Sequence, residues 1–334
     1  MQNFTDKRKN SVHPKLKQYS KEHERIVLSK IKKYPDLTPD ELIATCLDEV
    51  DAEGRSIGYY LGSRSYLYRL MHRENLINAK RSGGKGGHHN FNKKRLVATG
   101  PNSVWVWDIT YLYKNIEGEY FYLYAIMDLF SRKMIHHEVH DRQSDTIAAK
   151  FLEKALQLEN IAISGHLNNI VSNDIVVKDS LVLHSDNGGP MKGKNMLAKM
   201  EALGIVGSYS RPMHSNDNAA MESSFATLKH SHAVPIPKCF ESVKQAQEWS
   251  DKFYEWYNNS HLHSGIGFIT PNDCHNGLGP KIMANRNAII AKSEIGRKTI
   301  YKMPKSVSLM SFTTKRKTTE HNIKQAEYRH NTAT

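Results

Sequence analysis

Three carboxylate residues are the main candidates for catalysis in this 334-residue chain, because of their residue types and their positions in the sequence. Asp108 lies in the strand-like run VWVWDITYL, Asp186 ends another such run in LHSDNGGP, and Glu222 lies on a helix-like run, NDNAAMESSFATLK. Thirty-five residues separate Asp186 from Glu222. Hard divalent cations such as Mg²⁺ prefer carboxylate oxygens as ligands. If folding brings the three side chains together, we expect a metal-dependent enzyme that acts on nucleic-acid phosphodiesters.

Two Mg²⁺ ions, which Mn²⁺ can replace, are the cofactors expected of such a site. Two ions about 3.5–4 Å apart can clamp a phosphodiester, one activating the nucleophile and the other stabilising the leaving oxygen. Asp108 is expected to bridge both ions, with Asp186 and Glu222 as the further ligands. A lone Asp on a strand or a lone Glu on a helix is usually a turn, cap or surface residue. The prediction therefore depends on all three side chains converging.

Other residues offer weaker signals. Lys229 lies two helical turns, roughly 10 Å, beyond Glu222 on the same helix face and could contact a neighbouring phosphate. His136, His137 and His140 form a cluster that alternates along a strand, so its members point to different faces. A zinc site is conceivable there, but no cysteine pair accompanies the histidines, and we expect structural or surface roles for them.

The charge distribution favours a polyanionic partner. The net charge is +13 and the sequence pI is about 9.4. Residues 1–100 carry 20 Lys and Arg against 11 Asp and Glu, whereas residues 101–240 carry 13 against 15. Residues 241–334 are basic again, with 14 against 8. A cation-binding middle between two phosphate-binding flanks would have this pattern, although solvated lysines on a soluble protein would also give a basic pI.

Cysteine usage and hydropathy indicate where the protein works. Three cysteines lie far apart, which argues against a disulfide framework and against a CxxC zinc pair. No run of 18 apolar residues suggests a membrane span, and the first residues lack an apolar signal core. We therefore expect a cytoplasmic, nucleoid-associated protein with no membrane partner.

Residues 1–79 are predicted to form a small helical DNA-binding region. Helices are expected over residues 22–33, over residues 38–49 and over residues 63–75. Thr38 can cap the second helix, with Pro39 at its first position and Glu41 completing a capping box.

The third predicted helix carries the DNA-binding candidates of this region. Arg64, Tyr68 and Arg69 lie outside its apolar stripe, as in the reading helix of a helix-turn-helix protein. An ordinary small helical bundle with solvated arginines is the alternative. Residues 80–100 are rich in Gly, Lys and His and are predicted to be a flexible basic linker, lying along DNA or only separating two domains.

Residues 101–260 are predicted to form an α/β core with three layers and a mixed sheet. Short connections join its first three strands as an antiparallel meander. Residues 261–334 form a basic C-terminal region that includes a strand candidate within 305–318 and is expected to be disordered at its end. The core elements expected are strands 104–113, 119–127, 132–140, 180–185 and 204–209, helices 144–158, 192–203, 217–230 and 241–258, and an irregular insertion over 161–178.

Five motifs together resemble one family. WVWDITYL, YLYAIMDLFSRK, LHSDNGGP, SNDNAAMESSFATLK and YNNSHLHSGIGFITP are similar to the OrfB-type transposases of bacterial insertion sequences. The resemblance covers about residues 55–275. It implies a retroviral-integrase-like core, which is a ribonuclease-H-like mixed five-stranded sheet flanked by helices. A helix-turn-helix domain is expected to precede this core.

The resemblance also assigns residues. It maps Asp108, Asp186 and Glu222 onto the family's catalytic, metal-binding triad, and Lys229 onto the basic residue that follows the glutamate. His263, in the Tyr-Asn…His-Ser motif, becomes a further candidate for a DNA contact. Many relatives have arginine where this chain has His261. The N-terminal His/Cys zinc module of retroviral integrases is absent, since only Cys46 is available there.

The sequence therefore predicts a transposase that cleaves DNA and transfers strands at the ends of its own mobile element. Its expected partners are double-stranded DNA, both the terminal inverted repeats and the target, and further copies of itself, at least as a dimer on DNA. Relatives often act with a small OrfA protein that carries a leucine zipper, and this chain shows no sustained heptad. The alternatives are a catalytically inactive DNA-binding regulator of transposition and a ribonuclease-H-type nuclease acting on RNA–DNA hybrids.

Overall fold

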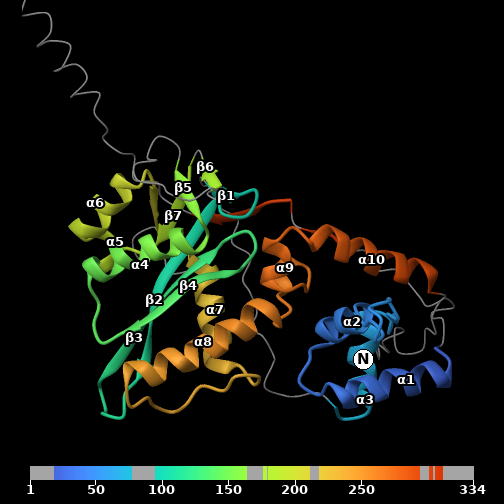
Figure 1. The fold of residues 1–334 in the computed structure, drawn as a ribbon. Helices are drawn as coiled ribbons and strands as arrows, with labels where there is room; N and C mark the ends of the chain where they lie inside the picture. Colours follow the sequence, from blue (N-terminus) through green and yellow to red (C-terminus); the bar gives the residue numbers. More distant parts are fainter. Residues whose placement is uncertain are drawn as a thin grey trace, which may run out of the picture. The chain divides into compact units, whose positions relative to one another are not determined.

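The computed structural model shows two compact units (Figure 1). One contains the N-terminal helices together with parts of residues 267–303, and the other contains the sheet. Among the described residues, no helix is both long and apolar enough to cross a membrane. The structure describes residues 19–76, 95–163, 176–178, 180–210, 218–293, 301–303 and 305–310.

The N-terminal unit packs three helices by their apolar faces. They are α1 (Lys21–Lys33), α2 (Pro39–Leu47) and α3 (Arg64–Arg73). Thr38 and Glu41 make the predicted capping box of α2, and Ser63 caps α3. The shared core includes Val27, Leu42, Leu47, Leu61, Leu67 and Leu70.

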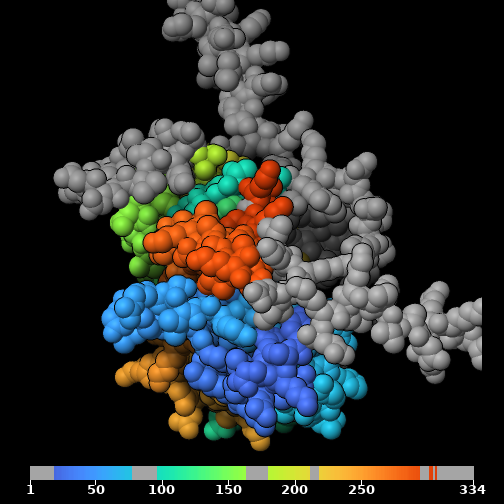
Figure 2. Space-filling model, turned by 90° about the vertical axis from the view of Figure 1, so that its right-hand side faces the viewer, coloured from blue at the N-terminus to red at the C-terminus, as the bar shows by residue number. Residues whose placement is uncertain are grey.

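A fourth helix that the sequence did not predict, α10 (Gly279–Lys292), belongs to the same unit. Its Ile290 joins the N-terminal core, and the fully buried Arg286 forms a two-bond ion pair with Asp48 at distances of 2.8 and 2.5 Å. The same guanidinium donates to the carbonyls of Gly267 and Phe268. The blue N-terminal helices and the orange segment that contains α10 can be followed in the space-filling view (Figure 2). This ion pair between the buried Arg286 and the exposed Asp48 fixes α10 to the C-terminal end of α2.

The second unit contains a mixed five-stranded sheet with the order β4-β3-β2-β7-β8. The first three strands pair antiparallel, and β2, β7 and β8 pair parallel. This confirms the predicted sheet and is the ribonuclease-H-like arrangement that the resemblance implies. The strands are β2 (Val104–Tyr113), β3 (Tyr120–Asp128), β4 (Met134–His140), β7 (Val182–Ser185) and β8 (Val206–Tyr209).

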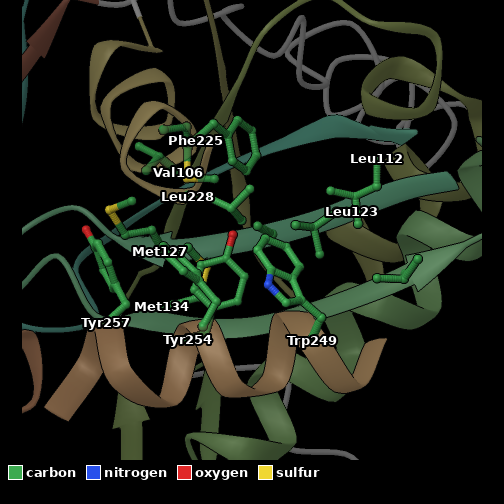
Figure 3. Packing of buried hydrophobic residues seen from close by; sticks show 14 of the residues in the cluster. Val106, Leu112, Leu123, Met127, Met134, Phe225, Leu228, Trp249, Tyr254 and Tyr257 are labelled. Carbon is green, nitrogen blue, oxygen red and sulfur yellow. The ribbon is translucent and has the colours of Figure 1, made fainter. Parts of the chain in front are cut away.

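Strand alternation gives the sheet two buried faces. Val104, Val106 and Leu112 of β2 pack on one side with α7 (Ala219–His230) and α8 (Val243–Asn259). Figure 3 shows Phe225 and Leu228 of α7, with Trp249, Tyr254 and Tyr257 of α8, directed at this face. Side chains of β2 at even positions therefore point toward α7 and α8.

The opposite face is covered by three helices, α4 (Asp145–Leu158), α5 (Gly189–Lys192) and α6 (Lys194–Ala202) (Figure 1). Trp105 and Trp107 of β2 pack there with Phe151 and Leu152 of α4. Burying both sheet faces gives a three-layer unit, as the sequence pattern predicted.

Two strand pairs and one short helix of this unit were not predicted. Residues 161–178, expected to be irregular, contain β5 (Ile161–Ile163) and β6 (Val176–Lys178), which pair parallel. Within the expected linker, β1 (Arg95–Ala98) pairs antiparallel with β9 (Val307–Met310), which lies in the segment 305–318 where a strand candidate was noted. A short helix, α9 (Pro271–His275), follows α8. Strands of three or four residues carry too little alternation to be recognised without their partners.

Candidate active site

Strand register places Asp108 and Asp186 side by side. β2 and β7 are parallel, and Val106 pairs with His184. Asp108 and Asp186 each lie two residues further along their chains, and neighbouring strands are about 4.8 Å apart. Both positions share the parity of Val106 and Val182, which pack in the α7/α8 core. The two aspartates therefore lie on the face of the sheet that carries α7.

The loop that carries Asp186 is held on both sides by Ser210. The Ser210 N–H donates to the carbonyl of Ser185 at 2.9 Å, and the Asn187 side-chain amide donates to the carbonyl of Ser210 at 2.9 Å. Asp186 Oδ1 accepts the N–H of Gly188 at 2.8 Å. This bond helps to fix the orientation of the carboxylate.

Just before Asp186, His184 is fully buried within β7. Its Nδ1 lies 3.0 Å from Ser208 Oγ, and its Nε2 lies 3.3 Å from Ser210 Oγ. These contacts join β7 to the end of β8 beneath the aspartate loop. His184 therefore has a positional role at this site that sequence reasoning did not identify.

Glu222 is brought to the aspartates by the start of α7. The buried side chain of Asn218 donates to the carbonyl of Trp107, the residue before Asp108, at 3.2 Å. Glu222 lies one turn further along α7, next to the fully buried Met221. Its own side chain is exposed, at the margin of the buried helix face. The contact of Asn218 with β2 therefore sets where Glu222 stands relative to Asp108.

The charges of Asp186 and Glu222 both act on Asp108. Burial, together with the negative charges of Asp186 and Glu222, raises the pKa of Asp108 to about 7, against the lowering effect of a hydrogen bond from the Ile109 N–H. Burial also raises the pKa of Glu222. Like charges that disfavour ionisation in this way are the setting in which a bound cation is most stabilising.

The carboxylates nevertheless do not form a closed cluster. In the part of the chain that the structure describes, no three His, Cys, Asp or Glu side chains are close enough together to count as a ready metal-binding group. Asp108 and Asp186 are held by the sheet, whereas Glu222 has a long, exposed side chain that can rotate. Three oxygen donors without sulfur or nitrogen suit Mg²⁺, which binds through a few carboxylates and keeps several waters.

The remaining candidates lie in different places. Lys229 is exposed in the last turn of α7, two turns beyond Glu222. His263 is half-buried, and burial together with the charge of Arg132 lowers its pKa to about 3. His263 is therefore neutral at physiological pH and can contact DNA only as a hydrogen-bonding group.

Arg64, Tyr68 and Arg69 are all exposed on α3, in the N-terminal unit. Arg64 forms an ion pair with Asp40 at 3.1 Å, and its guanidinium lies 5.4 Å from the centre of the Tyr68 ring. Arg69 is exposed beside them. The three side chains make one polar face of α3, opposite the buried Leu67 and Leu70.

The histidine cluster of β4 has a structural role. His136 and His140 both contact Glu138, at 3.0 and 2.9 Å, and Lys154 also binds that carboxylate. His137 contacts Asp251 of α8 at 2.8 Å. The imidazoles and their carboxylates are thus used to attach α4 and α8 to β4.

Comparison with known proteins agrees with the geometry. Two family models, both described as the integrase core domain, match residues 98–215 and 203–271, and together they span just over half of the chain. The transposase for insertion sequence element IS904 of Lactococcus lactis is 27% identical over 65% of this chain and 75% of its own length. The putative transposase InsK for IS150 of Escherichia coli is 26% identical over 55% of this chain and 58% of its own length.

A solved structure, the catalytic core domain of BIV integrase, is also similar, with 17% identity and a TM-score of 0.37 over 54% of this chain and 97% of that one. The domain matches and the transposase relatives define the class as proteins with an integrase core that act as nucleotidyl transferases on polynucleotides. The chain belongs to the integrase-core transposases of bacterial insertion sequences.

Proposed function

We propose that this transposase cleaves DNA at the ends of its own insertion sequence and joins the freed ends to a target. Asp108, Asp186 and Glu222 would hold two Mg²⁺ ions, or Mn²⁺ in their place. The observation that supports this most directly is that burial and the charges of Asp186 and Glu222 all raise the pKa of Asp108. Three neighbouring carboxylates would destabilise one another unless they shared a cation.

Bound divalent metal would activate the attacking oxygen and stabilise the leaving oxygen of the phosphodiester. The protein's own residues supply position. Ser210 and Asn187 orient the loop of Asp186, and Asn218 fixes α7 against β2. Because the carboxylates only need to hold cations, no covalent bond between protein and DNA is required.

DNA binding would be divided between the two units. The exposed face of α3, with Arg64, Tyr68 and Arg69, would recognise the terminal repeat. Lys229 would contact DNA near the reacting phosphate, and His263 would be a further DNA contact. Two DNA ends and a target must be held together, so at least two copies of the chain are expected on DNA. A small OrfA-type partner would add the zipper that this chain lacks.

The first test replaces each acid by its amide. Asp108→Asn, Asp186→Asn and Glu222→Gln should each lower strand transfer in Mg²⁺ by at least a thousandfold, because each removes a charged ligand from the site. Binding to a duplex carrying the element end should be retained, as measured by fluorescence anisotropy. Glu201→Gln, on α6 at the opposite sheet face, is the matched control and should join DNA like the wild type.

An amide variant that still joined DNA at the wild-type rate would remove that residue from the proposed site. A wild-type protein that bound the element end but never joined it, in either Mg²⁺ or Mn²⁺, would favour the alternative of a catalytically inactive regulator.

A further inference from the structure

Arg132 is a mostly buried cation that the proposed mechanism does not use. It lies in the turn between β3 and β4, where its φ of 66° is in the left-handed region and its N–H donates to the carbonyl of Asp128. Its guanidinium Nε is fully buried and has no hydrogen-bond partner in the structure. Among the described residues, no carboxylate lies within ion-pair distance of this guanidinium.

The nearest carboxylate is already fully used. Asp128 is completely buried, and its oxygens accept the N–H of Asn102 at 2.8 Å and both the N–H and the hydroxyl of Ser131, at 2.7 and 2.6 Å. Asp128 acts on Arg132 only through its field, which favours the charged guanidinium. The buried Nε of Arg132 therefore lies in an attractive potential, and the described residues offer it no hydrogen-bond acceptor.

Aromatic and imidazole rings surround the guanidinium. His263 lies close enough for the charge of Arg132 to lower its pKa, and Tyr257 of α8 also interacts with the guanidinium. The rings of His261 and Tyr257 stack at 5.2 Å, and those of His261 and His263 are 5.9 Å apart. Figure 3 shows Tyr257 on α8 beside Met127 and Met134, which lie on the two strands that flank this turn. The walls are thus rigid and carry no negative charge.

One side of this cradle is a glycine. A Cβ added to Gly265 would lie 3.8 Å from Arg132 Nε and 3.0 Å from His263 Cε1. Gly265 is exposed, in the short helix Ser264–Ile266 that follows His263. Beside the guanidinium, the exposed surface thus carries a residue that has no side chain.

Burying a charged group without a partner is costly, so an orphan guanidinium is evidence for an anion that completes it. Arginine presents a planar fork of donors that fits the oxygens of a phosphate. We propose that Arg132, with the rings of His261 and His263 as its walls, binds a phosphate of the DNA backbone. This inference rests on the proposed function, since DNA is the polyanion concerned.

The phosphate bound by Arg132 is different from the one that reacts. The turn containing Arg132 follows Asp128, which pairs with Trp105 at the beginning of β2. Asp108 lies three residues further along β2, away from the end of the strand that pairs with Asp128. Arg132 therefore anchors the duplex at a distance from the triad and would affect DNA affinity whether or not metal and chemistry are present.

The experiment measures binding of a duplex carrying the element end, by fluorescence anisotropy in EDTA at several salt concentrations. Arg132→Gln should weaken binding about tenfold near 0.1 M salt and lower the salt slope by about one, because one phosphate contact releases about 0.9 of a counterion. The control, Lys154→Gln, removes a charge already paired with Glu138 at 2.6 Å and should change neither quantity. Equal losses in the two variants would overturn the inference.

A second pair of variants does not depend on removing Arg132. Gly265→Asp places a carboxylate beside the guanidinium, whereas Gly265→Asn adds a side chain of the same size without charge. Gly265→Asp should melt at a higher temperature than Gly265→Asn and bind the duplex about tenfold more weakly, because its carboxylate replaces the phosphate. Equal DNA affinity of the two variants would overturn the inference. If the wild type transfers strands but these differences in binding are not seen, the Arg132 site is rejected and the proposed function is retained.

Discussion

At the scale of single residues, the proposed chemistry depends on groups that are not themselves acids. Asn218 donates its amide to the Trp107 carbonyl and so links the helix of Glu222 to the strand of Asp108. Asn187 and Ser210 hold the loop of Asp186. The positions of reacting groups control rate steeply, because a small misplacement of a catalytic group costs large factors.

Asn218→Ala should therefore affect activity more than stability. Losing the buried hydrogen bond should cost about 1 kcal/mol of unfolding free energy. Strand transfer should fall at least tenfold, because the hydrogen bond that holds α7 against β2, one turn before Glu222, is lost. The rate of joining and urea unfolding, followed by tryptophan fluorescence, check the two effects separately. All four tryptophans, Trp105, Trp107, Trp249 and Trp256, lie in the sheet-containing unit, so the signal reports on that unit.

Asn259→Ala is the matched control. It removes an exposed asparagine side chain that donates to Glu255 on the same helix, α8, and accepts from Asn272 of α9, and it should leave joining unchanged. If Asn218→Ala joined DNA as fast as Asn259→Ala, the anchoring role of Asn218 would be wrong.

At the scale of elements, one buried network attaches α9 to the core. His275 Nε2 lies 2.9 Å from Glu159 at the end of α4, and its Nδ1 lies 3.0 Å from Ser131 in the β3–β4 turn. Lys133 also binds Glu159, at 2.7 Å. The network joins three elements that are distant in sequence and lies beside the turn that carries Arg132.

The titration of this network has a definite sign. Burial by itself would lower the pKa of His275, but the carboxylates of Asp128 and Glu159 outweigh it and the pKa is raised. Its imidazolium therefore contributes stability that is complete below the free-histidine pKa of about 6.5 and is lost as pH rises through the raised value. Burial likewise opposes ionisation of Glu159, but bonds from His275 and Lys133 lower its pKa to about 2, so that contribution is lost only as pH falls toward 2.

His275→Gln should accordingly destabilise the sheet-containing unit by about 3 kcal/mol at pH 6, since one partner of a buried ion pair is removed. The difference from wild type should shrink between pH 6 and pH 9. Urea unfolding by tryptophan fluorescence across this range measures it. His230→Gln, at the exposed end of α7, should keep the wild-type pH dependence. A constant difference at all pH values would show that His275 is neutral in the folded protein.

At the scale of the whole molecule, the basic N-terminal unit and the sheet-containing unit would divide DNA binding between them. Two arginines lie on the exposed face of α3. Arg64 is paired with Asp40, whereas Arg69 forms no ion pair with the described residues. Burial raises the pKa of Asp40, against the effect of Arg64. The carboxylate thus competes with DNA for Arg64.

Arg69→Gln should therefore weaken binding to the element end more than to random duplex, if α3 reads bases and not only phosphates. Asp40→Asn should strengthen binding a few-fold and raise the salt slope, because Arg64 is released from its partner. Anisotropy titrations with both duplexes measure these effects. Arg55→Gln, a nearby exposed arginine paired with Asp51 and Glu53, is the control. An equal loss on both duplexes would reduce α3 to a phosphate anchor.

The sequence by itself determined whatever depends on short-range pattern. The capping box of Thr38 and Glu41, the alternation of residues 104–113 and the apolar stripes of α4, α7 and α8 predicted those elements within a few residues, because caps and periodicity act locally. The motifs around Asp108, Asp186 and Glu222 were likewise sufficient to indicate the family.

Tertiary structure alone decided what depends on long-range contacts. The pairing of β1 with β9, the burial of Arg286 against Asp48 and the link from Asn218 to Trp107 each join residues about 100 to more than 200 positions apart. Whether a polar side chain is partnered or orphaned is a property of its surroundings after folding, so Arg132 in the sequence looked like any arginine in a turn. The structure shows that the Nε of Arg132 is buried without a hydrogen-bond partner, among the strands, α8 and the segment that contains His261 and His263.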